Sequence, residues 1–339
     1  MKKLLTIAIP TYSRSRELRR ALDAIACQYD ERVEVLVSDD ASPDDTELIV
    51  SEAQKNMPIR YIKNKENLGY DRNFLQCYKK ATGKYVMLMG NDDFLLEGSV
   101  EHILDYLETN SNVDWVYVNF KKFKEIDNRI IFEDSYTPEI NDRFNVSKTE
   151  FMKYASVWVS TLTSIVHREK ALKIKCYAEY FDTFFLAVCI PLEITKDAGY
   201  RLGIIGQALI AYNCPLNEPI KDKYFRMFGT GLRYALCVIG PRCGYNIKIM
   251  RKAFKNGFLT WISKIISLRA ERETYRRKLF WKDGFASVKD YPVAWLTVIP
   301  LGLLPRFLAV FMLKYIKPIY KYIKSLCNKV KRKVIKYKL

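Results

Sequence analysis

The sequence has few of the residues that build zinc sites or disulfide frameworks. Among its 339 residues there are two histidines, and its eight cysteines include no CxxC pair. Structural zinc sites need four Cys or His ligands, usually at short spacings. The sequence therefore argues against a zinc protein, and it favours reduced, mostly buried thiols in a cytosolic compartment.

Two glycine-rich phosphate-binding motifs are also absent. The first apolar segment leads into "PTYSRSRE", which contains neither GxGxxG nor GxxxxGK[ST]. This argues against a nicotinamide-dependent enzyme and a P-loop nucleotidase. The N-terminal apolar run is about seven residues long and ends in a proline turn, so we interpret it as a strand and not as a signal peptide.

Acidic residues are missing from the C-terminal end of the chain. Residues 291–339 contain eleven Lys or Arg and no Asp or Glu. Residues 221–339 contain 28 basic and 5 acidic side chains, a balance of +23, whereas residues 1–120 contain 15 and 20, a balance of −5. The basic character of the protein is therefore a property of its last third.

The start of this basic region is apolar but interrupted. "VAWLTVIPLGLLPRFLAVFML" contains Pro300, Gly302, Pro305 and Arg306, and a spanning helix needs about 20 uninterrupted apolar residues. We expect residues 293–316 to lie in the interface of an anionic membrane or to enter it shallowly, with a true span as the alternative. Nucleic acid is the rival partner, but the neighbouring apolar residues favour lipid, so no nucleic acid is expected.

Strand and helix patterns alternate through residues 1–120. Near-continuous apolar runs predict strands at 4–10, 33–40, 59–64, 84–90 and 114–120, and helical spacing predicts helices at 15–28, 42–55, 70–83 and 96–110. Such alternation indicates an α/β fold with a mostly parallel sheet flanked by helices.

The next hundred residues have a less regular pattern. We expect an excursion or hairpin at 121–150, β-rich structure at 154–167, a helix interrupted near Pro191 at 178–199, and a pair of short strands at 200–213. From about residue 215 the pattern becomes helical and basic.

Polar clusters follow three of the predicted strands: "PTYSR", "SDDASPDD" and "GNDD". Ligands of parallel sheets bind beyond the carboxyl ends of the strands. Two adjacent carboxylates at such a place repel each other and lose hydration unless a cation or hydrogen-bond donors meet them. The sequence therefore predicts a divalent-metal site after the fourth strand; helix capping by the Asp residues is the alternative.

Three stretches, "IAIPTYSRSRELRRAL", "VEVLVSDDASPDDT" and "ENLGYDRNFLQCYKKATGKYVMLMGNDD", resemble the family 2 glycosyltransferases. These are inverting enzymes of the GT-A fold that use nucleotide sugars. The resemblance covers residues 1–215, and the "GNDD" variant looks like the abequosyltransferase-like subgroup that builds bacterial surface glycans.

The resemblance implies a nucleotide pocket after the first two strands. Tyr12 would stack on the pyrimidine, with Pro10 and Thr11 shaping the pocket. Asp40 would accept the N–H of a uracil ring, and Asp39 would orient the loop. An ordinary turn tyrosine and a helix-capping carboxylate are the alternatives.

It also implies a diphosphate site. Asn67 and Gly69 would form a turn before Arg72, which would contact the diphosphate or hold the carboxylates, unless it forms only a structural ion pair.

The acids after the fourth strand would hold Mg²⁺ or Mn²⁺. Asp93 matches the main metal position, and Asp92 would contact the ribose or a metal-bound water. Asn91 stands where some relatives have an acid, which lowers the local charge but keeps an oxygen ligand.

An inverting transfer also needs a base for the acceptor hydroxyl. Many relatives have a Glu-Asp pair at the start of a helix well after the metal motif, and this sequence has none at the expected place. Asp182 is the first candidate and Glu193 the second; a helix cap or a solvated acid explains either one equally simply.

Together these features predict a peripheral enzyme at the cytoplasmic face of the bacterial inner membrane. It would transfer a sugar, from a UDP-linked donor, to a polyprenyl-diphosphate-linked glycan. We expect a GT-A domain at 1–215, a basic helical region at 216–290 and a membrane-association segment at 291–339. A non-catalytic scaffold with the same fold and a nucleic-acid binder are the alternative functions.

Overall fold

The computed structural model describes residues 3–127, 129–132, 140–155, 163–213, 225–259, 261–270 and 280–316. The chain divides into two compact units, Met1–Asn217 with Gly231–Phe254, and Glu218–Thr230 with Lys255–Leu339. The first unit thus also takes in residues beyond the domain boundary expected at 215. The predicted boundaries at 215 and 290 stay predictions.

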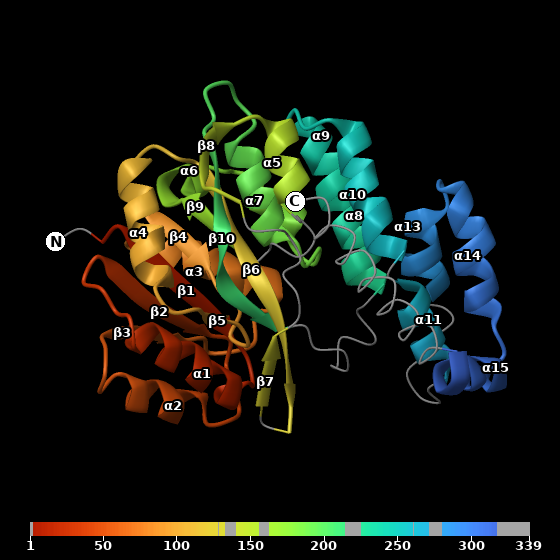
Figure 1. Cartoon of the computed structure of the whole chain (residues 1–339), viewed down its shortest axis with the longest axis horizontal. Helices are drawn as coiled ribbons and strands as arrows, with labels where there is room; N and C mark the ends of the chain where they lie inside the picture. Colours follow the sequence, from red (N-terminus) through yellow and green to blue (C-terminus); the bar gives the residue numbers. More distant parts are fainter. Residues whose placement is uncertain are drawn as a thin grey trace, which may run out of the picture. The chain divides into compact units, whose positions relative to one another are not determined.

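The first unit is built on one ten-stranded mixed sheet flanked by helices (Figure 1). Its main path runs β3-β2-β1-β4-β9-β6-β10-β5, while β7 pairs with β6 and β8 pairs with β10. The strands are β1 (Leu5–Thr11), β2 (Val33–Asp39), β3 (Ile59–Lys63), β4 (Tyr85–Leu88), β5 (Phe94–Leu95), β6 (Trp115–Ile126), β7 (Arg129–Phe132), β8 (Arg143–Val146), β9 (Ser164–His167) and β10 (Leu202–Asn213).

Strands β3, β2, β1 and β4 form a parallel block on one side of the sheet, as predicted. β1 pairs in parallel with both β2 and β4, and β2 with β3. All residues of β1, β2 and β4 are buried, which is why their sequences are mostly apolar and do not alternate between polar and apolar residues.

One antiparallel strand interrupts this order. β9 lies antiparallel between β4 and β6, and β6 is parallel to β10. The carboxyl ends of β1, β2, β4, β6 and β10 therefore lie at the same edge of the sheet. The residues that follow these strands are brought to that edge.

The predicted helices form where the apolar spacing places them. Helix α1 buries Leu18, Ala21, Leu22 and Ile25, the 3–4 spacing of one helix face. The helices of the first half are α1 (Ser15–Ala26), α2 (Thr46–Ala53), α3 (Tyr70–Lys80), α4 (Ser99–Thr109), α5 (Lys148–Tyr154), α6 (Arg168–Leu172), the 3₁₀ helix η2 (Tyr177–Tyr180) and α7 (Leu186–Ile194). After them come η4 (Arg226–Gly231), α8 (Leu232–Tyr234), η5 (Ala235–Ile239), α9 (Gly240–Arg242) and α10 (Ile247–Leu259).

Two details differ from the predictions. Of residues 200–213, Leu202–Asn213 form the single long strand β10 and not two short strands. The register of β10 shifts between Ile205 and Ala208 and between Ala208 and Ile210. Pro191 lies inside α7, whose helix continues through it, so the interruption expected there is wrong. The irregular backbone lies earlier, where Asp182 and Phe184 have φ of 64° and 65°.

The hairpin alternative for residues 121–150 is confirmed in part. β6 continues to Ile126 and pairs antiparallel with β7. Of the predicted β-rich segment 154–167, the structure shows β9, and residues 156–162 lie outside the described residues.

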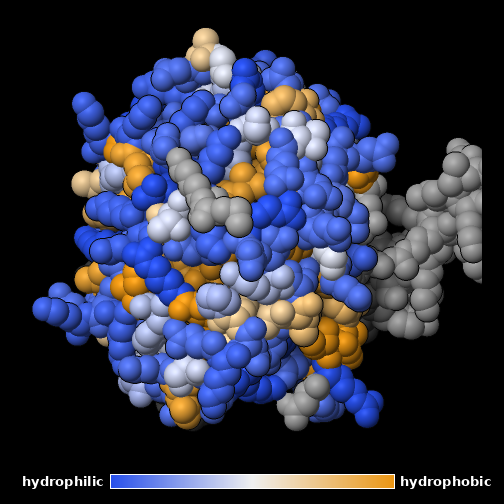
Figure 2. Space-filling model, turned by 90° about the vertical axis from the view of Figure 1, so that its left-hand side faces the viewer, coloured by the Kyte–Doolittle hydropathy of each residue, from blue (hydrophilic) through white to orange (hydrophobic). Residues whose placement is uncertain are grey.

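The face seen in Figure 2 is mostly hydrophilic, with apolar residues gathered in smaller groups. This is the side of the molecule on which α4 and β3 lie in Figure 1. A surface of this composition is typical of a water-exposed face.

The second unit is helical. Its described elements after residue 260 are α11 (Trp261–Ala270), η6 (Phe280–Phe285), α13 (Ala286–Val288), α14 (Pro292–Leu303), α15 (Arg306–Phe311) and η7 (Met312–Ile316). The Arg269 guanidinium donates to the carbonyl of Leu304. Within the described ranges, no helix has both the length and the apolar composition that crossing a membrane requires.

Candidate active site

The three polar segments that follow β1, β2 and β4 meet at the carboxyl edge of the sheet. The backbone N–H of Asp40 donates to the carbonyl of Thr11 at 2.9 Å. The Asn91 side-chain amide donates to the Thr11 hydroxyl at 2.8 Å. Thr11 therefore links the ends of the other two strands, and the segments predicted to line one site do lie together.

Asp93 is fully buried at this edge. One of its carboxylate oxygens accepts the N–H of Asn213, at the end of β10, at 2.8 Å. Its other oxygen, Oδ2, has no hydrogen-bond partner within the described ranges. A buried carboxylate oxygen without a donor is costly, and it needs an explanation.

Asp92 lies beside two arginines of the segment that follows β1. Arg14 Nη1 donates to Asp92 Oδ2 at 2.7 Å, and Arg20 Nη2 donates to the Asp92 carbonyl at 3.0 Å. The Arg20 guanidinium also lies over the rings of Phe94 and Phe123, 5.5 and 4.9 Å from their centroids. Arg14 thus gives the Asp92 carboxylate a directly bonded counter-charge, whereas Asp93 Oδ2 has no hydrogen-bond partner in the described ranges.

The surroundings of Asp92 and Asp93 disfavour the ionised form of both carboxyl groups. Burial raises the pKa of Asp93 well above its ordinary value, and the charge of Asp92 raises it further. Burial also raises the pKa of Asp92, while Arg14 acts in the opposite direction. A cation placed between these acids and a ligand would reverse both effects.

The residues fit a magnesium or manganese ion held partly by a ligand. Such ions are commonly bound through one or two carboxylates together with phosphate oxygens and waters. Asp93 Oδ2 is the unsatisfied oxygen that could serve, and Asp92 lies next to it in the chain. Across the part of the chain that the structure describes, no cluster of three or more His, Cys, Asp or Glu could hold a metal alone. The remaining ligands would have to come from the bound molecule.

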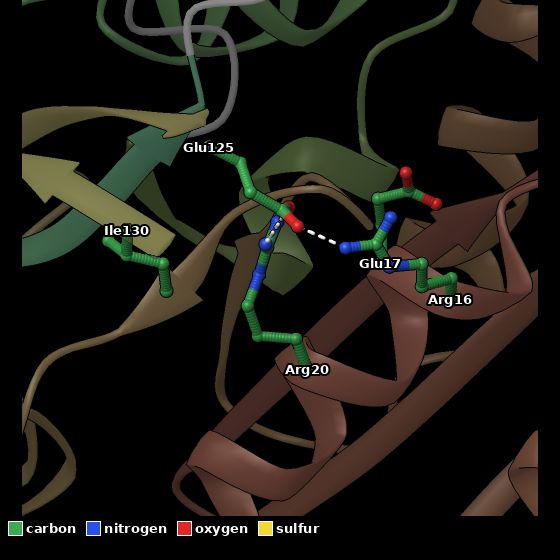
Figure 3. Close-up of a pocket in the computed structure, with 5 residues that line it drawn as sticks. All are labelled: Arg16, Glu17, Arg20, Glu125 and Ile130. Carbon is green, nitrogen blue, oxygen red and sulfur yellow. Dashed lines mark hydrogen bonds and ion pairs between the residues drawn. The ribbon is translucent and has the colours of Figure 1, made fainter. Parts of the chain in front are cut away.

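A small pocket of about 190 Å³ lies near these acids (Figure 3). Its lining residues come from α1, β6 and β7: Arg16, Glu17, Arg20, Glu125 and Ile130. Glu125, at the end of β6, pairs with Arg16 and, at 3.0 Å, with Arg20. Arg20 thus connects the pocket to Asp92 through the Asp92 carbonyl.

Asp39 is buried and orders the loop after β2. Its carboxylate accepts the N–H of Ser42 at 2.9 Å and the hydroxyl of Tyr61 at 2.6 Å. Both bonds tie the loop to the sheet, and the role of Asp39 in the nucleotide pocket stays a prediction.

Asp40 holds the turn that precedes α3. Its two carboxylate oxygens accept hydrogen bonds from the Asn64 side chain at 2.9 Å, Leu68 N–H at 2.8 Å and Gly69 N–H at 2.9 Å. Asn67 Oδ1 also accepts from Gly69 N–H, at 3.1 Å. Gly69 has a φ of +84°, which favours glycine. The contact of Asp40 with a uracil ring stays a prediction, since its oxygens accept from protein donors here.

Tyr12 is open to solvent at the end of β1, with 48% of its surface exposed. Pro10 and Thr11 lie just before it, buried within β1. Large exposed aromatic rings beside a polar cleft can stack on a nucleobase, so the position of Tyr12 is compatible with its predicted role.

Arg72 lies beside the first candidate base. Its guanidinium is 3.8 Å from the Asp182 carboxylate and 4.5 Å from the centroid of the Phe181 ring. The two charged side chains are 45% and 63% exposed, so the ion pair by itself stabilises the fold little. The structure thus places Arg72 with Asp182.

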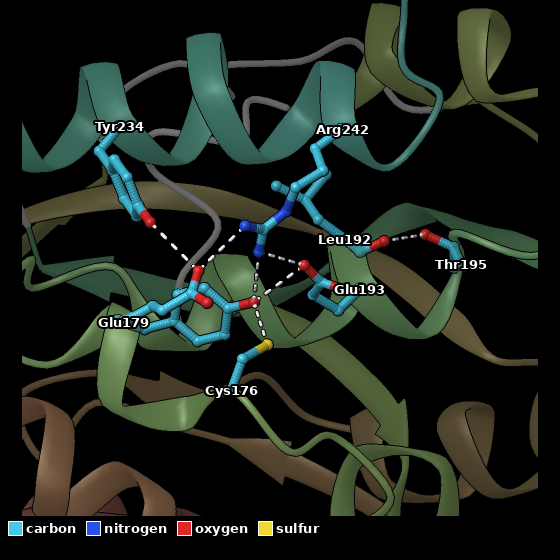
Figure 4. A network of polar contacts seen from close by, with 8 residues as sticks. Cys176, Glu179, Leu192, Glu193, Thr195, Tyr234 and Arg242 are labelled. Atoms are coloured by element: carbon cyan, nitrogen blue, oxygen red, sulfur yellow. Dashed lines mark hydrogen bonds and ion pairs between the residues drawn. The ribbon is translucent and has the colours of Figure 1, made fainter.

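Glu193 belongs to a different network (Figure 4). It accepts from Arg242 at 2.7 Å and from the Tyr180 hydroxyl at 2.9 Å. Arg242 also pairs with Glu179, at 3.0 Å. Burial would raise the pKa of Glu193, but the hydrogen bonds from Arg242 and Tyr180 outweigh it and lower the pKa. An ion-paired carboxylate is a weak base, and the role of Glu193 as second candidate base stays a prediction.

Over residues 6–172 the sequence matches the family model described as Glycosyl transferase family 2. This chain belongs to that family. The family members use nucleotide-sugar donors, and the strand-end acids described above lie within the matched residues.

Two curated relatives and one solved structure illustrate the similarity. The abequosyltransferase RfbV of Salmonella typhimurium is 36% identical over 224 residues, 61% of this chain and 66% of the relative. The GalNAc(5)-diNAcBac-PP-undecaprenol beta-1,3-glucosyltransferase of Campylobacter jejuni is 32% identical over 102 residues, 30% of this chain and 33% of the relative. The first match thus spans just under two thirds of its relative, and the second spans about one third.

The solved structure is the mannosyltransferase PcManGT of Pyrobaculum calidifontis in complex with GDP-Man and Mn²⁺. It aligns with a TM-score of 0.52 over 94% of this chain and 88% of that chain, at 14% identity. At this identity the likeness shows the fold alone. The α/β fold of the first unit is therefore GT-A-like.

Sequence reasoning missed three residues of this region. Arg14 and Arg20 provide the counter-charge at Asp92, although "PTYSR" was part of the predicted site. Asp71, which is 4% exposed, accepts backbone N–H groups near Asp182. Its signal was readable: Asp71 lies on the same helix face as Phe74 and Tyr78, where an acid is unexpected.

Proposed function

We propose that this protein is a metal-dependent, inverting glycosyltransferase. It transfers a sugar from a nucleotide-diphosphate donor, of the UDP class, to a polyprenyl-diphosphate-linked glycan of a bacterial surface polysaccharide. Family membership supports the reaction class. The relative from Campylobacter jejuni, whose name gives an undecaprenol-diphosphate acceptor, supports the acceptor class.

The single observation that carries this proposal is the state of Asp93. Its carboxylate is fully buried, it follows Asp92 directly, and one of its oxygens lacks a partner in the described structure. Burying a carboxylate with an unpaired oxygen does not stabilise the fold. A site for the cation that accompanies a donor diphosphate explains it.

Each neighbouring group has a defined task in this reaction. When bound, Mg²⁺ or Mn²⁺ neutralises the negative charge that builds up on the departing nucleoside diphosphate. Asp93 and Asp92 would hold that cation, and Asn91 fixes the turn by donating to Thr11. Tyr12 offers an exposed ring to the base of the nucleotide.

The acceptor hydroxyl needs a base at the opposite side of the transferred sugar. We assign this role to Asp182, which is exposed and lies in a loop before α7. Arg72 beside it balances its charge. Glu193 is excluded from the role in this proposal because Arg242 and Tyr180 occupy its carboxylate.

We further propose that the protein docks on the cytoplasmic face of the membrane through residues 291–339. In the described part of this segment, several large apolar side chains are exposed, among them Trp295, Leu296, Leu303, Phe307 and Phe311. The basic side chains of the segment would meet anionic lipid. An enzyme that uses a soluble donor and a lipid-linked acceptor needs this location.

The test is a thermal-shift screen of nucleoside diphosphates and nucleotide sugars, with and without Mn²⁺. We expect the wild type to be stabilised by one nucleotide class only when Mn²⁺ is present. Asp93→Ala should lose this shift and the turnover of the donor while remaining folded. The control is Asp23→Ala, which removes an exposed carboxylate from α1. Full donor turnover by Asp93→Ala would refute the metal assignment.

The same assay distinguishes an enzyme from the alternative, a non-catalytic scaffold with the same fold. Slow, Mn²⁺-dependent hydrolysis of a nucleotide sugar by the wild type would exclude the scaffold. Inertness toward every donor would favour it.

A further inference from the structure

Helix α3 holds the loop that contains Asp182. The side chain of Asp71, on the first turn of α3, is 4% exposed. Its Oδ2 accepts the backbone N–H of Phe184 at 2.9 Å, and its Oδ1 accepts the N–H of Leu186 at 3.2 Å. Both oxygens of one buried carboxylate thus bind a loop more than a hundred residues further along the chain.

These bonds take the place of a local helix cap. Helix α7 begins at Leu186, and its N-cap residue Phe185 supplies no side-chain hydrogen bond. A Ser or Asp at position 185 would satisfy the first N–H groups of α7 locally. The cap comes from α3, and therefore it also determines where the start of α7 lies relative to α3.

The loop backbone needs this support. Asp182 and Phe184 have φ of 64° and 65°, a left-handed conformation that side chains other than glycine rarely adopt. Such conformations persist only when surrounding contacts impose them, and they concentrate at functional sites. The bond from Phe184 to Asp71 fixes one of the two residues directly.

The neighbours of Asp71 on α3 contact the same loop. The Tyr70 ring lies 6.2 Å from the Phe184 ring, centroid to centroid. Arg72 lies against Phe181 and 3.8 Å from the carboxylate of Asp182. Consecutive residues of α3 therefore hold the loop on both sides of Asp182.

Helix α3 is in turn fixed to the end of β2. The Asn73 amide donates to the Ser38 carbonyl at 2.9 Å and its oxygen accepts from the Ser38 hydroxyl at 2.7 Å. The turn before α3 is held by Asp40 through the N–H groups of Leu68 and Gly69. A continuous set of buried polar contacts thus connects the sheet edge to the loop before α7.

We infer that Asp71 is a positioning residue: it sets the distance between the strand-end acids and Asp182, and so aligns the base with the reacting carbon. This inference rests on the proposed function, because it takes Asp182 to be the base. It assigns Asp71 no contact with the substrate. Misplacing a catalytic group by about 1 Å costs up to roughly 100-fold in rate.

The test is a double-mutant cycle on donor hydrolysis, with water as the acceptor. The substrate is whichever UDP-hexose the wild type hydrolyses fastest with Mn²⁺. Asp182→Asn should lower kcat by about 100-fold or more. Asp71→Asn should lower kcat by about 10-fold or more and change the KM for the donor less than twofold, since the strand-end acids are unchanged. Asp71→Ala is the second variant.

Non-additivity is the decisive result. If Asp71 acts through Asp182, Asp71→Asn causes no further loss in the Asp182→Asn background. The inference would be overturned if the two losses in kcat multiplied in the double variant. An unchanged kcat in Asp71→Asn would overturn it as well. Asp23→Asn, on the exposed side of α1, is the matched control.

The two proposals fail in different ways. A wild type that hydrolyses no nucleotide sugar would refute the proposed function. A wild type that loses activity with Asp182→Asn but not with either Asp71 variant would leave the function standing and refute the positioning role. If Asp71→Ala does not fold, the Asp71→Asn cycle decides.

Discussion

The guanidinium of Arg14 lies 2.7 Å from the carboxylate of Asp92, and both side chains are mostly withdrawn from solvent. This ion pair neutralises one of the two adjacent acids in the metal-free protein. Asp93 has no such partner in the described structure and accepts one backbone hydrogen bond, from Asn213. The pair is therefore asymmetric: an arginine is hydrogen-bonded to the carboxylate of Asp92, and no described arginine is bonded to that of Asp93.

Arg14→Gln should change stability and metal affinity in opposite directions. Without metal, the variant should lose about 1–2 kcal/mol of unfolding free energy, because Asp92 loses its charged donor. The affinity for Mn²⁺ should rise roughly three- to tenfold, because a positive charge beside the site is removed.

The measurements are urea unfolding and Mn²⁺ titration by electron paramagnetic resonance. Arg19→Gln is the matched control, since Arg19 lies on the same helix but pairs with Glu52. Weaker Mn²⁺ binding by Arg14→Gln would contradict this prediction.

The two candidate bases should separate in a comparison of stability and activity. Asp182→Asn should leave the melting temperature nearly unchanged, because the side chain is 63% exposed, while kcat falls about 100-fold or more. Glu193→Gln should lower the free energy of unfolding by about 1–3 kcal/mol, because it weakens the network with Arg242. It should keep nearly full activity. Loss of activity without loss of stability in Glu193→Gln would reverse the assignment.

The stability of the protein should depend on pH through Asp71. Burial is the main cause that raises the pKa of Asp71 from 3.8 to about 6. The folded state thus keeps a proton that the unfolded state has already released. The contribution of Asp71 to stability is full below pH 4 and is lost as the pH rises through 6, by about 3 kcal/mol at most.

Asp71→Asn cannot titrate, so it should lack this part of the pH dependence. The measurement is the free energy of unfolding from urea titrations at pH 4 and pH 7, for wild type, Asp71→Asn and Asp23→Asn. The expected difference is a smaller decline between the two pH values in Asp71→Asn alone. Equal declines in all three proteins would show that Asp71 does not titrate in this range.

Membrane docking should depend on the exposed apolar side chains of the second unit. Leu296 and Phe307 are 82% and 72% exposed. Leu296→Glu combined with Phe307→Glu should lower the fraction that floats with anionic liposomes by about tenfold, through lost apolar burial and added negative charge. High salt should weaken wild-type binding.

Leu48→Glu is the control, because Leu48 is 54% exposed but lies on α2 in the first unit. Unchanged flotation of the double variant, and of a protein lacking residues 291–339, would contradict the proposed docking. Stronger salt-sensitive binding to duplex DNA than to these liposomes would favour the nucleic-acid alternative.

The sequence was sufficient to predict a structural feature where a single physical requirement determines that feature. The buried strands β1, β2 and β4 were readable because a strand covered on both faces must be apolar throughout. The acids at the strand ends were readable because parallel strands place their carboxyl ends at one edge. The turn at Gly69 was predictable because glycine adopts a positive φ without steric cost.

Other features depended on contacts between distant residues. The antiparallel insertion of β9 between β4 and β6 follows from which strands pair, and the pattern of four residues does not specify a partner. The continuation of α7 through Pro191 likewise depends on tertiary packing, which overrides the local cost of a proline. The sequence ranked Asp182 first and Glu193 second as candidate bases, but the partners that distinguish them, Arg72 and Arg242, are brought to them only by the fold.

The sequence by itself thus determined the family, the parallel block of strands and the acids at the strand ends, since each follows from residue types and short spacings. Only the tertiary structure decided that Glu193 is paired with Arg242, that Arg14 neutralises Asp92, and that Asp71 reaches across to the loop of Asp182. The physical reason is that charge and hydrogen-bond state depend on which groups come within about 3 Å, a property of the folded chain.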